Sequence, residues 1–343
     1  MGILTRNNLL KSKHSFELPF SMIFAIIAGA VILFLAVYGA TKFINTSQKT
    51  AYSESAKSLL NFLNPMVNSI TSEMSIPIGF LRETRLYLSC STKSEKSPIF
   101  GKQTLGFSEQ SGFLKRWPNP GENISRYNKY IFSKNIEQGK RVYLSSKPFY
   151  IGYRVDDLIF INADKYCFVT PPSQIEKEIK FMQSENLNAT SRIDQCSADS
   201  IKVCFGNSMS LSSCNISVIG DCNDNYCGAY TNYETGVVLK EGKQMNYFGN
   251  LLYAAIFSSP EIYECNLFRL GKKTVELGKV YLEEIDTLNA NNCNSVIDTE
   301  ISNIIDIASN LTSAKIKDIR YQAKLMDIKN CASNCPVYAA ESC

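Results

Sequence analysis

The feature that most constrains this chain is an uncharged apolar run near its N-terminus. From Leu18 to Thr41, 24 consecutive residues carry no charged side chain. As an α-helix, with a rise of about 1.5 Å per residue, the run spans roughly 36 Å and exceeds the roughly 30 Å hydrocarbon core of a bilayer. A cleaved secretory signal has a shorter apolar core, of about 7–15 residues. The run therefore predicts a retained transmembrane helix over residues 18–41, rather than a signal peptide or a buried helix of a soluble core.

The charges that flank this run predict how the chain crosses the membrane. Three basic residues precede the run and two follow it (Arg6, Lys11 and Lys13; Lys42 and Lys49). The bias is small, but a short basic tail normally stays in the cytoplasm. We therefore expect residues 1–17 to form a cytoplasmic tail of a single-pass cell-membrane protein. Membrane lipid would surround the helix, and the bulk of the chain would be extracytoplasmic.

Twelve cysteines lie beyond the apolar run: Cys90, Cys167, Cys196, Cys204, Cys214, Cys222, Cys227, Cys265, Cys293, Cys331, Cys335 and Cys343. An even number on one side of a membrane is typical of a disulfide framework in an oxidising compartment. Buried free thiols are the alternative, because cysteine also packs as a small apolar residue. The sequence does not determine the pairing. Proximity alone suggests Cys204 with Cys214 across a hairpin and Cys222 with Cys227 across a loop.

Sequons occur along the predicted extracytoplasmic part. Five asparagines fit the N-x-[ST] pattern: Asn45, Asn123, Asn188, Asn215 and Asn310. Outside the cytoplasm such sites permit glycosylation. The composition of the chain produces about this many sequons by chance, so Asn123, Asn188, Asn215 and Asn310 are only candidate glycosylation sites.

A helical stalk is predicted directly after the anchor, over residues 42–79. Apolar residues recur there at three- and four-residue spacing, as on one face of an amphipathic helix: Ala56, Leu59, Leu60, Leu63, Val67, Ile70 and Met74. Pro65 predicts a kink. This apolar face needs a partner, which is either the protein's own domain or a neighbouring subunit.

Residues 80–190 are predicted to form a mixed β domain. Apolar residues alternate between about 142 and 168, as expected for strands, and Asp156-Asp157 is interpreted as a turn between two of them. Ser173 and Glu176 match the S-x-x-E capping box, which predicts a short helix after two prolines.

Residues 191–343 are predicted to combine a disulfide-rich loop region, a hairpin and helices. Short strands are expected near 201–205 and 214–219, and Glu241-Gly242 is interpreted as a hairpin turn. One helix is expected over 251–257, and Ser259-Pro260 is typical of the start of another. Apolar spacing predicts a last long helix from about residue 301 to 331. The expected fold class is α+β: a transmembrane helix with a stalk, a mixed β and loop disulfide-rich ectodomain, and a helical C-terminal region.

The distribution of histidine excludes several kinds of active site. His14 is the single histidine, and it lies on the predicted cytoplasmic side. The ectodomain therefore cannot build a Ser-His-Asp site, a Cys-His site or a histidine-ligated metal centre. We expect no catalytic residues, no bound metal and no cofactor.

Three other patterns resemble sites but lack a required part. Asp156-Asp157 and Glu283-Glu284 are adjacent in sequence, so their side chains diverge, and solvated surface is the expected explanation. The segment 221–226 begins like a calcium loop but has Tyr226 where the sharp turn needs glycine. Residues 331–335 place three residues between two cysteines, one more than a redox Cys-x-x-Cys motif has.

The charge of the chain does not suggest nucleic acid as a partner. The formal net charge is +4 over 343 residues, and the sequence has no concentrated basic stripe. The expected partners are membrane lipid and other envelope proteins or copies of the same chain.

The residues that lead into the apolar run resemble the leader of archaeal type IV prepilins, which carries a K-G/Q-x-S-x-E-F pattern. Lys11, Ser15 and Glu17 match this pattern, whereas Ser12 replaces glycine and Lys13 replaces glutamine. The resemblance implies processing after Ser12 and a role for Glu17 in offsetting the N-terminal amine of a neighbouring pilin subunit. A plain charge at the membrane edge is the alternative for Glu17.

A second resemblance covers both ends of the chain. The stretches SFELPFSMIF, LLYAAIFSSPEIYECNLFRL (251–270) and NNCNS (291–295) resemble an uncharacterised group of membrane-anchored proteins of small-genome archaea. That resemblance implies an archaeal source and a location at the cell surface. It implies no activity.

These observations predict a single-pass protein with a structural, assembly or adhesion role at the archaeal cell surface, and not an enzyme. A type IV pilin-like subunit is the first alternative. An extracytoplasmic enzyme without histidine chemistry is the second, and it requires a pocket lined by convergent carboxylates.

Overall fold

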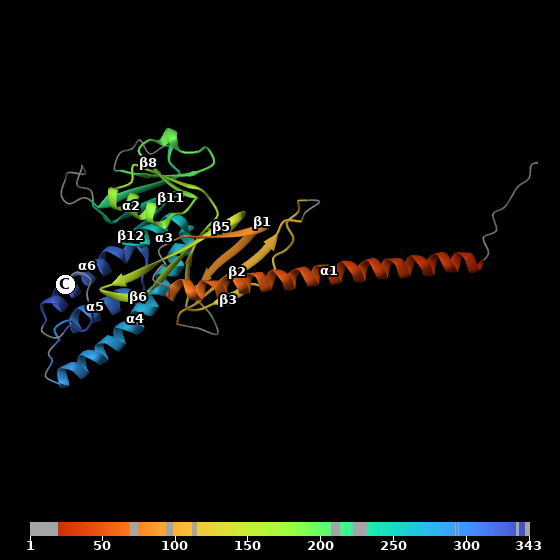
Figure 1. Ribbon diagram of the computed structural model, residues 1–343. Helices are drawn as coiled ribbons and strands as arrows, with labels where there is room; N and C mark the ends of the chain where they lie inside the picture. The colour runs from red at the N-terminus through yellow and green to blue at the C-terminus, as the bar shows by residue number, and fades with distance from the viewer. Residues whose placement is uncertain are drawn as a thin grey trace, which may run out of the picture. The chain divides into compact units, whose positions relative to one another are not determined.

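The computed structural model describes residues 20–68, 75–93, 99–111, 115–206, 213–221, 232–291, 293, 295–333 and 336–339, with the side chains of 62–68 and 232 excepted. The contacts within the chain define two units, Met1–Gln48 and Lys49–Cys343. Figure 1 shows the elements of the chain. The expected α+β class is confirmed, with an N-terminal apolar helix, a strand-rich middle and C-terminal helices.

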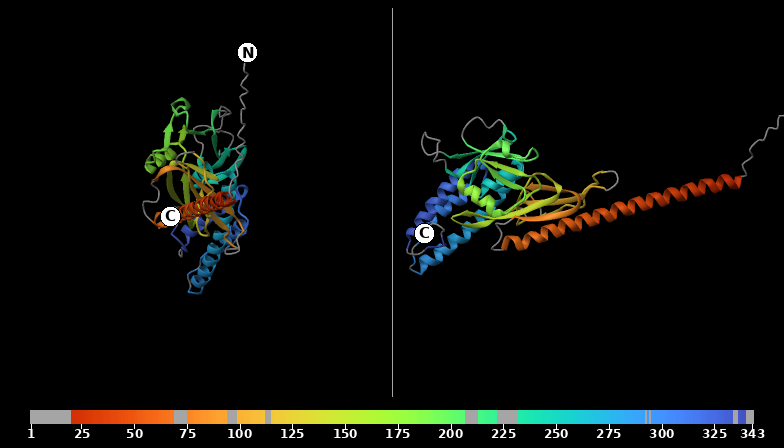
Figure 2. Two further views of the ribbon diagram at one scale, coloured as in Figure 1. Left: turned by 90° about the vertical axis from the view of Figure 1, so that its right-hand side faces the viewer. Right: turned by 45° about the horizontal axis from the view of Figure 1, so that its top comes forward.

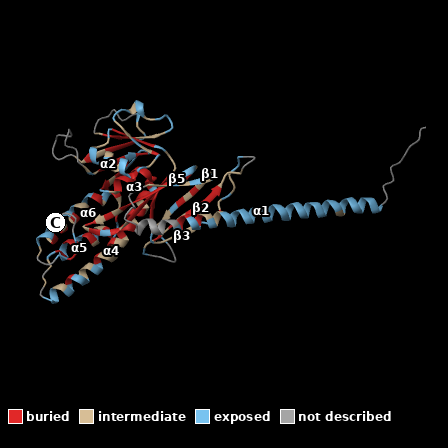
Figure 3. Cartoon of the chain, in the orientation of Figure 1, coloured by how far each residue is buried: buried red, intermediate tan, exposed pale blue. Residues whose placement is uncertain are grey.

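The helix α1 (Phe20–Asn68) begins in the first unit and continues through Pro65 without interruption. Over residues 20–48 nearly every side chain is exposed, including large apolar ones such as Phe24 and Phe34 (Figure 3). Among the described helices, it is the one long and apolar enough to cross a membrane. An exposed apolar surface of this extent is of the kind that usually marks a membrane or protein contact.

Six strands form sheet A: β1 (Ile76–Ser91), β2 (Lys102–Glu109), β3 (Ile124–Arg126), β4 (Tyr130–Phe132), β5 (Ile136–Ile151) and β6 (Tyr153–Asn162). Their order is β3-β2-β1-β5-β6-β4, antiparallel except between β4 and β6. Of this sheet the sequence predicted the part after about residue 142. The long strands β1 and β2 were missed because aromatic, proline and glycine residues interrupt their alternation.

The second part of α1 packs on one face of sheet A. Ala56 and Leu60 are buried in one cluster with Ile159 and Ile161 of β6. Leu158 and Phe160 of β6 belong to the cluster on the opposite face, as alternation along a strand requires. The expected stalk helix therefore contacts the protein's own sheet, and residues 76–79 of the expected stalk belong to β1 instead.

The turn expected at Asp156-Asp157 is wrong, because both residues lie inside β6. The chain turns at Gly152, whose φ of 73° suits glycine, and β5 pairs with β6 on either side of it. Asp157 is only 3% exposed and accepts two hydrogen bonds of 2.7 Å from Arg154. Asp156 pairs with Lys273. These carboxylates are partnered parts of a strand and do not form a solvated loop.

Six further strands form sheet B: β7 (Tyr166–Val169), β8 (Leu187–Thr190), β9 (Ile201–Phe205), β10 (Ile216–Asp221), β11 (Asn232–Lys240) and β12 (Lys243–Phe248). Their order is β12-β11-β10-β9-β7-β8. The neighbouring strands β8, β7, β9 and β10 are parallel to one another. Strand β11 pairs antiparallel with both β10 and β12. Sheet B thus takes strands from both sides of residue 190, where the sequence placed a boundary between regions.

Two sequence expectations for sheet B have different outcomes. The hairpin turn at Glu241-Gly242 is confirmed, with φ values of 53° and 70°, which match the turn types that favour hairpins. Cys204 and Cys214 are joined by a disulfide, as their proximity suggested. The expected hairpin between them is wrong, because β9 and β10 run parallel.

The helices after sheet B are α3 (Leu251–Phe257), α4 (Pro260–Ala290), α5 (Asp298–Ala308) and α6 (Ile316–Ala332). All seven residues of α3 are buried, and the ring of Phe257 lies 5.7 Å from Phe160 of sheet A and 4.9 Å from Tyr166 of sheet B. The single long helix expected from 301 to 331 is wrong. A 3₁₀ turn over Ser313–Lys315 separates α5 from α6.

The helices α4, α5 and α6 lie together (Figures 1 and 2). A Cβ at Gly271 of α4 would lie 2.4 Å from the carbonyl oxygen of Ala308. Glycine is therefore required there for α5 to approach α4 closely.

A buried guanidinium joins α4 to sheet A. Arg269 is completely buried and donates to the carbonyl oxygens of Phe100, Tyr127 and Lys129 at 2.8–2.9 Å. It also donates to the side chain of Asn266 at 2.8 Å. Burial lowers the pKa of Arg269 to about 10. The charge is held by neutral oxygens, so this contact ties the helix to three separate backbone positions.

A buried carboxyl lies where sheet A meets sheet B. Glu137 is fully buried and accepts hydrogen bonds from the backbone N–H groups of Lys134 (3.0 Å) and Ala163 (2.9 Å). Burial raises its pKa to about 7, although the charge of Lys134 and these two hydrogen bonds act in the opposite direction. The folded protein therefore holds this proton more tightly than the unfolded chain between about pH 4.5 and pH 7.

We expect the free energy of unfolding to fall by about 2 kcal/mol as the pH rises from 5 to 7, since the folded state binds the extra proton. Glu137→Gln should remove this slope. The single histidine lies in the N-terminal tail, and burial of Lys240 lowers its pKa only to about 8, so neither group obscures the window. Urea unfolding at several pH values measures the slope in both proteins. An equal slope in the variant would contradict the assignment.

Candidate functional site

The candidate site lies where the parallel strand β7 ends. Strands β8 and β9 pair with opposite sides of β7, so the chain leaves this strand at a point where the sheet order reverses. In sheets with parallel strands, ligands commonly bind just beyond the carboxyl ends of the strands at such a point. Thr170, with φ of 50°, turns the chain, and two prolines lead into α2 (Ser173–Met182).

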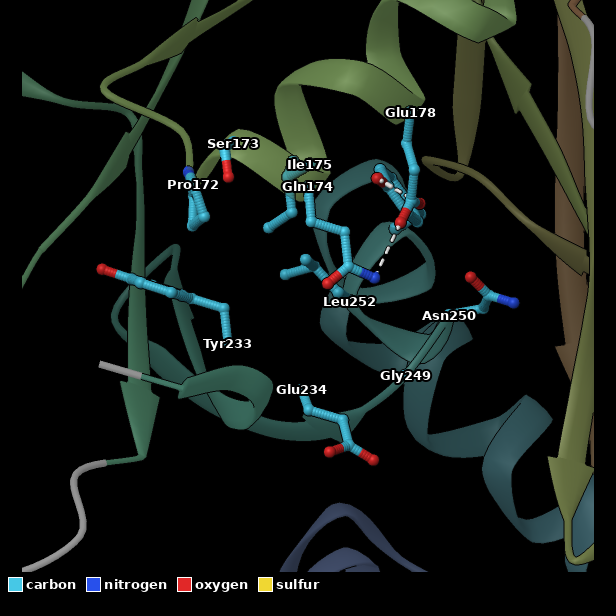
Figure 4. Close-up of a pocket in the computed structure, with 11 residues that line it drawn as sticks. Pro172, Ser173, Gln174, Ile175, Glu178, Tyr233, Glu234, Gly249, Asn250 and Leu252 are labelled. Atoms are coloured by element: carbon cyan, nitrogen blue, oxygen red, sulfur yellow. Dashed lines mark hydrogen bonds between the residues drawn. The ribbon is translucent and has the colours of Figure 1, made fainter. Parts of the chain in front are cut away.

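A cavity of about 560 Å³ opens beside the start of α2 (Figure 4). Its walls come from the first turns of α2, the beginning of β11 and the beginning of α3. The lining residues are Pro172, Ser173, Gln174, Ile175, Glu178, Tyr233, Glu234, Gly249, Asn250, Leu252 and Tyr253. Figure 4 shows the side chains of α2 on one side and Tyr233 and Glu234 on the other. Such a volume is typical of small-ligand sites, which hold about 300–1,000 Å³.

Glu178 brings a carboxylate to the cavity from the α2 side. It accepts hydrogen bonds from Lys147 Nζ at 2.9 Å and from the Tyr253 hydroxyl at 2.8 Å. Lys147 comes from β5 of sheet A, is 4% exposed and lies 5.0 Å from the centre of the Tyr253 ring. The carboxylate is thus neutralised by a buried cation and held in one orientation.

Glu234 brings a second carboxylate to the opposite wall. Its side chain pairs with Arg320 of α6, and its backbone carbonyl accepts a hydrogen bond from Gly249 N at 2.7 Å. Burial lowers the pKa of Arg320 from its ordinary value, but the guanidinium stays charged. Each carboxylate of the cavity therefore has its own cation.

An aromatic ring and aliphatic groups form the rest of the wall. Tyr233 is partly buried and packs edge-to-face on Phe205, with ring centres 5.6 Å apart. Burial raises the pKa of its hydroxyl, which stays protonated and can donate. Leu252 and Ile175 add apolar surface, whereas Ser173 and Gln174 add polar groups. The cavity thus combines an apolar face with hydrogen-bonding groups.

The helix α2 was predicted, but its capping box is wrong. Pro172 holds the cap position, Ser173 is already helical, and no side chain caps this end. Glu176 instead pairs with Lys180 one turn later. The first N–H groups of a helix have no partner within it, so this end of α2 presents donors beside the cavity.

The predicted cysteine framework is largely in place among the described residues. Disulfides join Cys90 to Cys265, Cys167 to Cys196 and Cys204 to Cys214. The first connects β1 to α4, and the other two lie in and beside sheet B. Cys293 and Cys331 are also disulfide-bonded. The suggested pair of Cys222 with Cys227 lies outside the described residues, as do Cys335 and Cys343.

The other predicted sites lie away from the cavity lining. The four candidate glycosylation asparagines, Asn123, Asn188, Asn215 and Asn310, are all exposed. Glu283 and Glu284 are exposed on α4, as expected for solvated surface. Glu17 and most of the loop that begins like a calcium site lie outside the described residues. No group of acidic, histidine or cysteine side chains suited to a metal ion occurs in the described part of the chain.

Sequence reasoning missed the residues of the cavity. The strand before Pro171 and the helix after it were both expected, but the parallel pairing that places their junction at a switch point was not. Tyr233 and Glu234 come from a strand more than 50 residues later, and no local pattern marks their approach to Gln174.

Comparison with known proteins identifies no relative of this chain. No family model, curated protein or solved structure matches the chain. The two resemblances noted from the sequence therefore stay expectations, and the function is inferred from the residues themselves.

Proposed function

We propose that this chain is a membrane-anchored extracytoplasmic protein that acts in recognition, assembly or adhesion at the cell surface. The observation that carries this proposal is the exposed apolar surface of α1 over residues 20–48, in a chain whose disulfides all lie beyond that segment. A helix of this kind requires lipid or apolar neighbours, and disulfides form in an oxidising compartment. Together they favour a single anchor with the folded unit outside the cytoplasm.

A pilin-like subunit is a second candidate because α1 is one unbroken helix of 49 residues. Its second part is hydrogen-bonded to β3 of sheet A and to the segment just before it. Glu122 N donates to Ser53 Oγ at 2.7 Å, and Arg126 donates to the Asn61 side chain at 2.9 Å. A helix that is apolar at one end and built into a sheet at the other suits a filament subunit as well as an anchor. The resemblance of the residues around Ser12 to prepilins adds to this alternative.

Catalysis is not part of the proposal. The cavity does have two glutamates, which is the feature that an enzyme without histidine would need. Both are engaged, Glu178 by Lys147 and Glu234 by Arg320. A binding site uses such fixed, neutralised carboxylates as hydrogen-bond acceptors, so recognition is the function that this geometry favours.

Protease treatment of intact cells that express the full chain tests the topology. With tags at both ends, we expect added proteinase K to remove the C-terminal tag and to leave the N-terminal tag protected. Permeabilised cells are the control, in which both tags should be lost. Loss of only the N-terminal tag from intact cells would overturn the proposal.

Intact-mass analysis of an untagged preparation distinguishes the two candidates, because a start at Lys13 indicates prepilin-type processing and a retained N-terminal tail indicates a plain anchor.

A further inference from the structure

We propose that the cavity beside α2 binds a neutral, hydroxyl-rich ring, such as one unit of a sugar chain. This inference deepens the recognition role proposed above and depends on it only for the compartment where the ligand is met. The cavity has balanced charges, several hydrogen-bonding groups and an aromatic wall, and each of these features favours such a ligand.

The charge balance argues against an ionic ligand. An anion at the start of α2 would approach the carboxylates of Glu178 and Glu234, which line the same cavity. A cation would have to compete for the two carboxylates with cations that the protein already supplies. Lys147 Nζ lies 2.9 Å from the carboxylate of Glu178, and the Arg320 guanidinium pairs with Glu234. Because each charge is matched, a neutral ligand enters at the smallest electrostatic cost.

The hydrogen-bonding groups suit hydroxyls, which both donate and accept. The carboxylate oxygens of Glu178 and Glu234 are acceptors, whereas the start of α2 and the Tyr233 hydroxyl supply donors. The Ser173 hydroxyl supplies both kinds, and the Gln174 amide, which donates to Glu178 Oε1 at 3.4 Å, adds its carbonyl oxygen as an acceptor and its second N–H as a donor. Figure 4 shows Gln174 on one side of the cavity and the ring of Tyr233 on the other, with the Tyr233 hydroxyl at the end of the side chain farther from Gln174. A ligand between them meets an amide on one side and an aromatic ring on the other.

The aromatic wall distinguishes a sugar ring from a small polar molecule such as glycerol. Tyr233 is held by its edge-to-face contact with Phe205, and Leu252 adds an aliphatic surface. The C–H faces of a pyranose are apolar, and its rim carries hydroxyls. Such a ring therefore matches a cavity that has an apolar wall and polar side chains around it. The volume of about 560 Å³ admits such a ring together with bridging water.

Ligand-observed NMR on the detergent-solubilised full chain tests the inference. The probes are the methyl glycosides of glucose, galactose, mannose and N-acetylglucosamine, with inorganic phosphate and glycerol as comparison probes. We expect at least one glycoside to bind with a Kd on the order of 1 mM, which is typical of a ligand of this size. Tyr233→Ala should weaken that binding about tenfold through loss of the ring contact.

Matched variants separate a specific effect from misfolding. Tyr321→Ala removes a tyrosine that is 68% exposed on α6 and does not line the cavity, so it should bind like the parent. Gln174→Ala tests the opposite wall and should also weaken binding, with an unchanged thermal transition. Binding of no glycoside, preference for phosphate, or an unchanged affinity in Tyr233→Ala would each overturn the inference. The protease result is independent, since an inverted topology would leave glycoside binding by the purified protein intact.

Discussion

Replacing Arg269 with methionine is expected to lower the free energy of unfolding by about 4 kcal/mol, the largest effect of any single substitution considered for this protein. Methionine keeps much of the side-chain volume but donates no hydrogen bond. The partly buried carbonyl oxygens of Phe100, Tyr127 and Lys129 would then lose this charged donor. A lost charged donor of this kind costs about 1.5–3 kcal/mol per bond, and compensation by water lowers the sum.

Thermal unfolding with the disulfides intact measures this effect. We expect a fall in Tm of about 8 °C for a unit of this size. Arg269→Lys should not restore the stability, because an ammonium group cannot reach backbone oxygens in several directions as the guanidinium fork does. Arg192→Met is the matched control. Arg192 makes an exposed ion pair with Asp194, and its loss should change stability by less than about 0.5 kcal/mol. A decrease in Tm of less than about 2 °C in Arg269→Met would contradict this account.

Removing the Cys90–Cys265 disulfide by a double substitution to alanine is expected to cost about 5 kcal/mol. This bond connects β1 to α4 across a sequence separation of 175 residues. A cross-link that closes a long loop removes more conformational freedom from the unfolded chain than one that closes a short loop. By the same relation, Cys204–Cys214, with a separation of 10, contributes about 3 kcal/mol.

The ranking of the two disulfides is the critical measurement. Guanidinium unfolding of Cys90→Ala/Cys265→Ala and of Cys204→Ala/Cys214→Ala, compared with the parent, gives both values under identical conditions. Each variant keeps all other bonds, so each serves as the control for the other. A larger loss in the Cys204–Cys214 variant would show that local packing, rather than loop closure, determines the contribution.

Arg269 and Cys265 lie one turn apart on the same face of α4, so their effects should be coupled. The disulfide fastens this face of the helix to β1, and Arg269 fastens it to the segment before β2 and to the segment after β3. Loss of one attachment allows the other to relax. The combined variant should therefore lose less stability than the sum of the separate losses.

Local patterns predicted individual elements well. The uncharged run predicted α1, the Glu241-Gly242 pair predicted the hairpin of β11 and β12, and Ser259-Pro260 predicted the start of α4. Each signal depends on the chemistry of a few neighbouring residues: the absence of charge, tolerance of positive φ, or the fixed φ of proline. Such properties act over one or two turns of chain and are visible in the sequence.

Pairing between distant segments could not be predicted in the same way. Asp156-Asp157 looked like a turn because two adjacent carboxylates are usually solvated. In the folded chain Arg154 and Lys273 neutralise them, and Lys273 comes from a helix more than 100 residues later. The stretch LLYAAIF, which contributed to one resemblance, is buried in every residue because it lies between the two sheets.

By itself, the sequence determined the apolar helix, the one-sided distribution of cysteines and the lack of histidine chemistry beyond the N-terminal tail. Only the tertiary structure decided which cysteines pair, that Arg269 is fully buried, and that Glu178 and Glu234 face one cavity. The physical reason is the range of the interactions. Hydrophobicity and backbone preference belong to single residues and their neighbours, whereas charge pairing, burial and the shape of a cavity depend on which distant strands and helices meet.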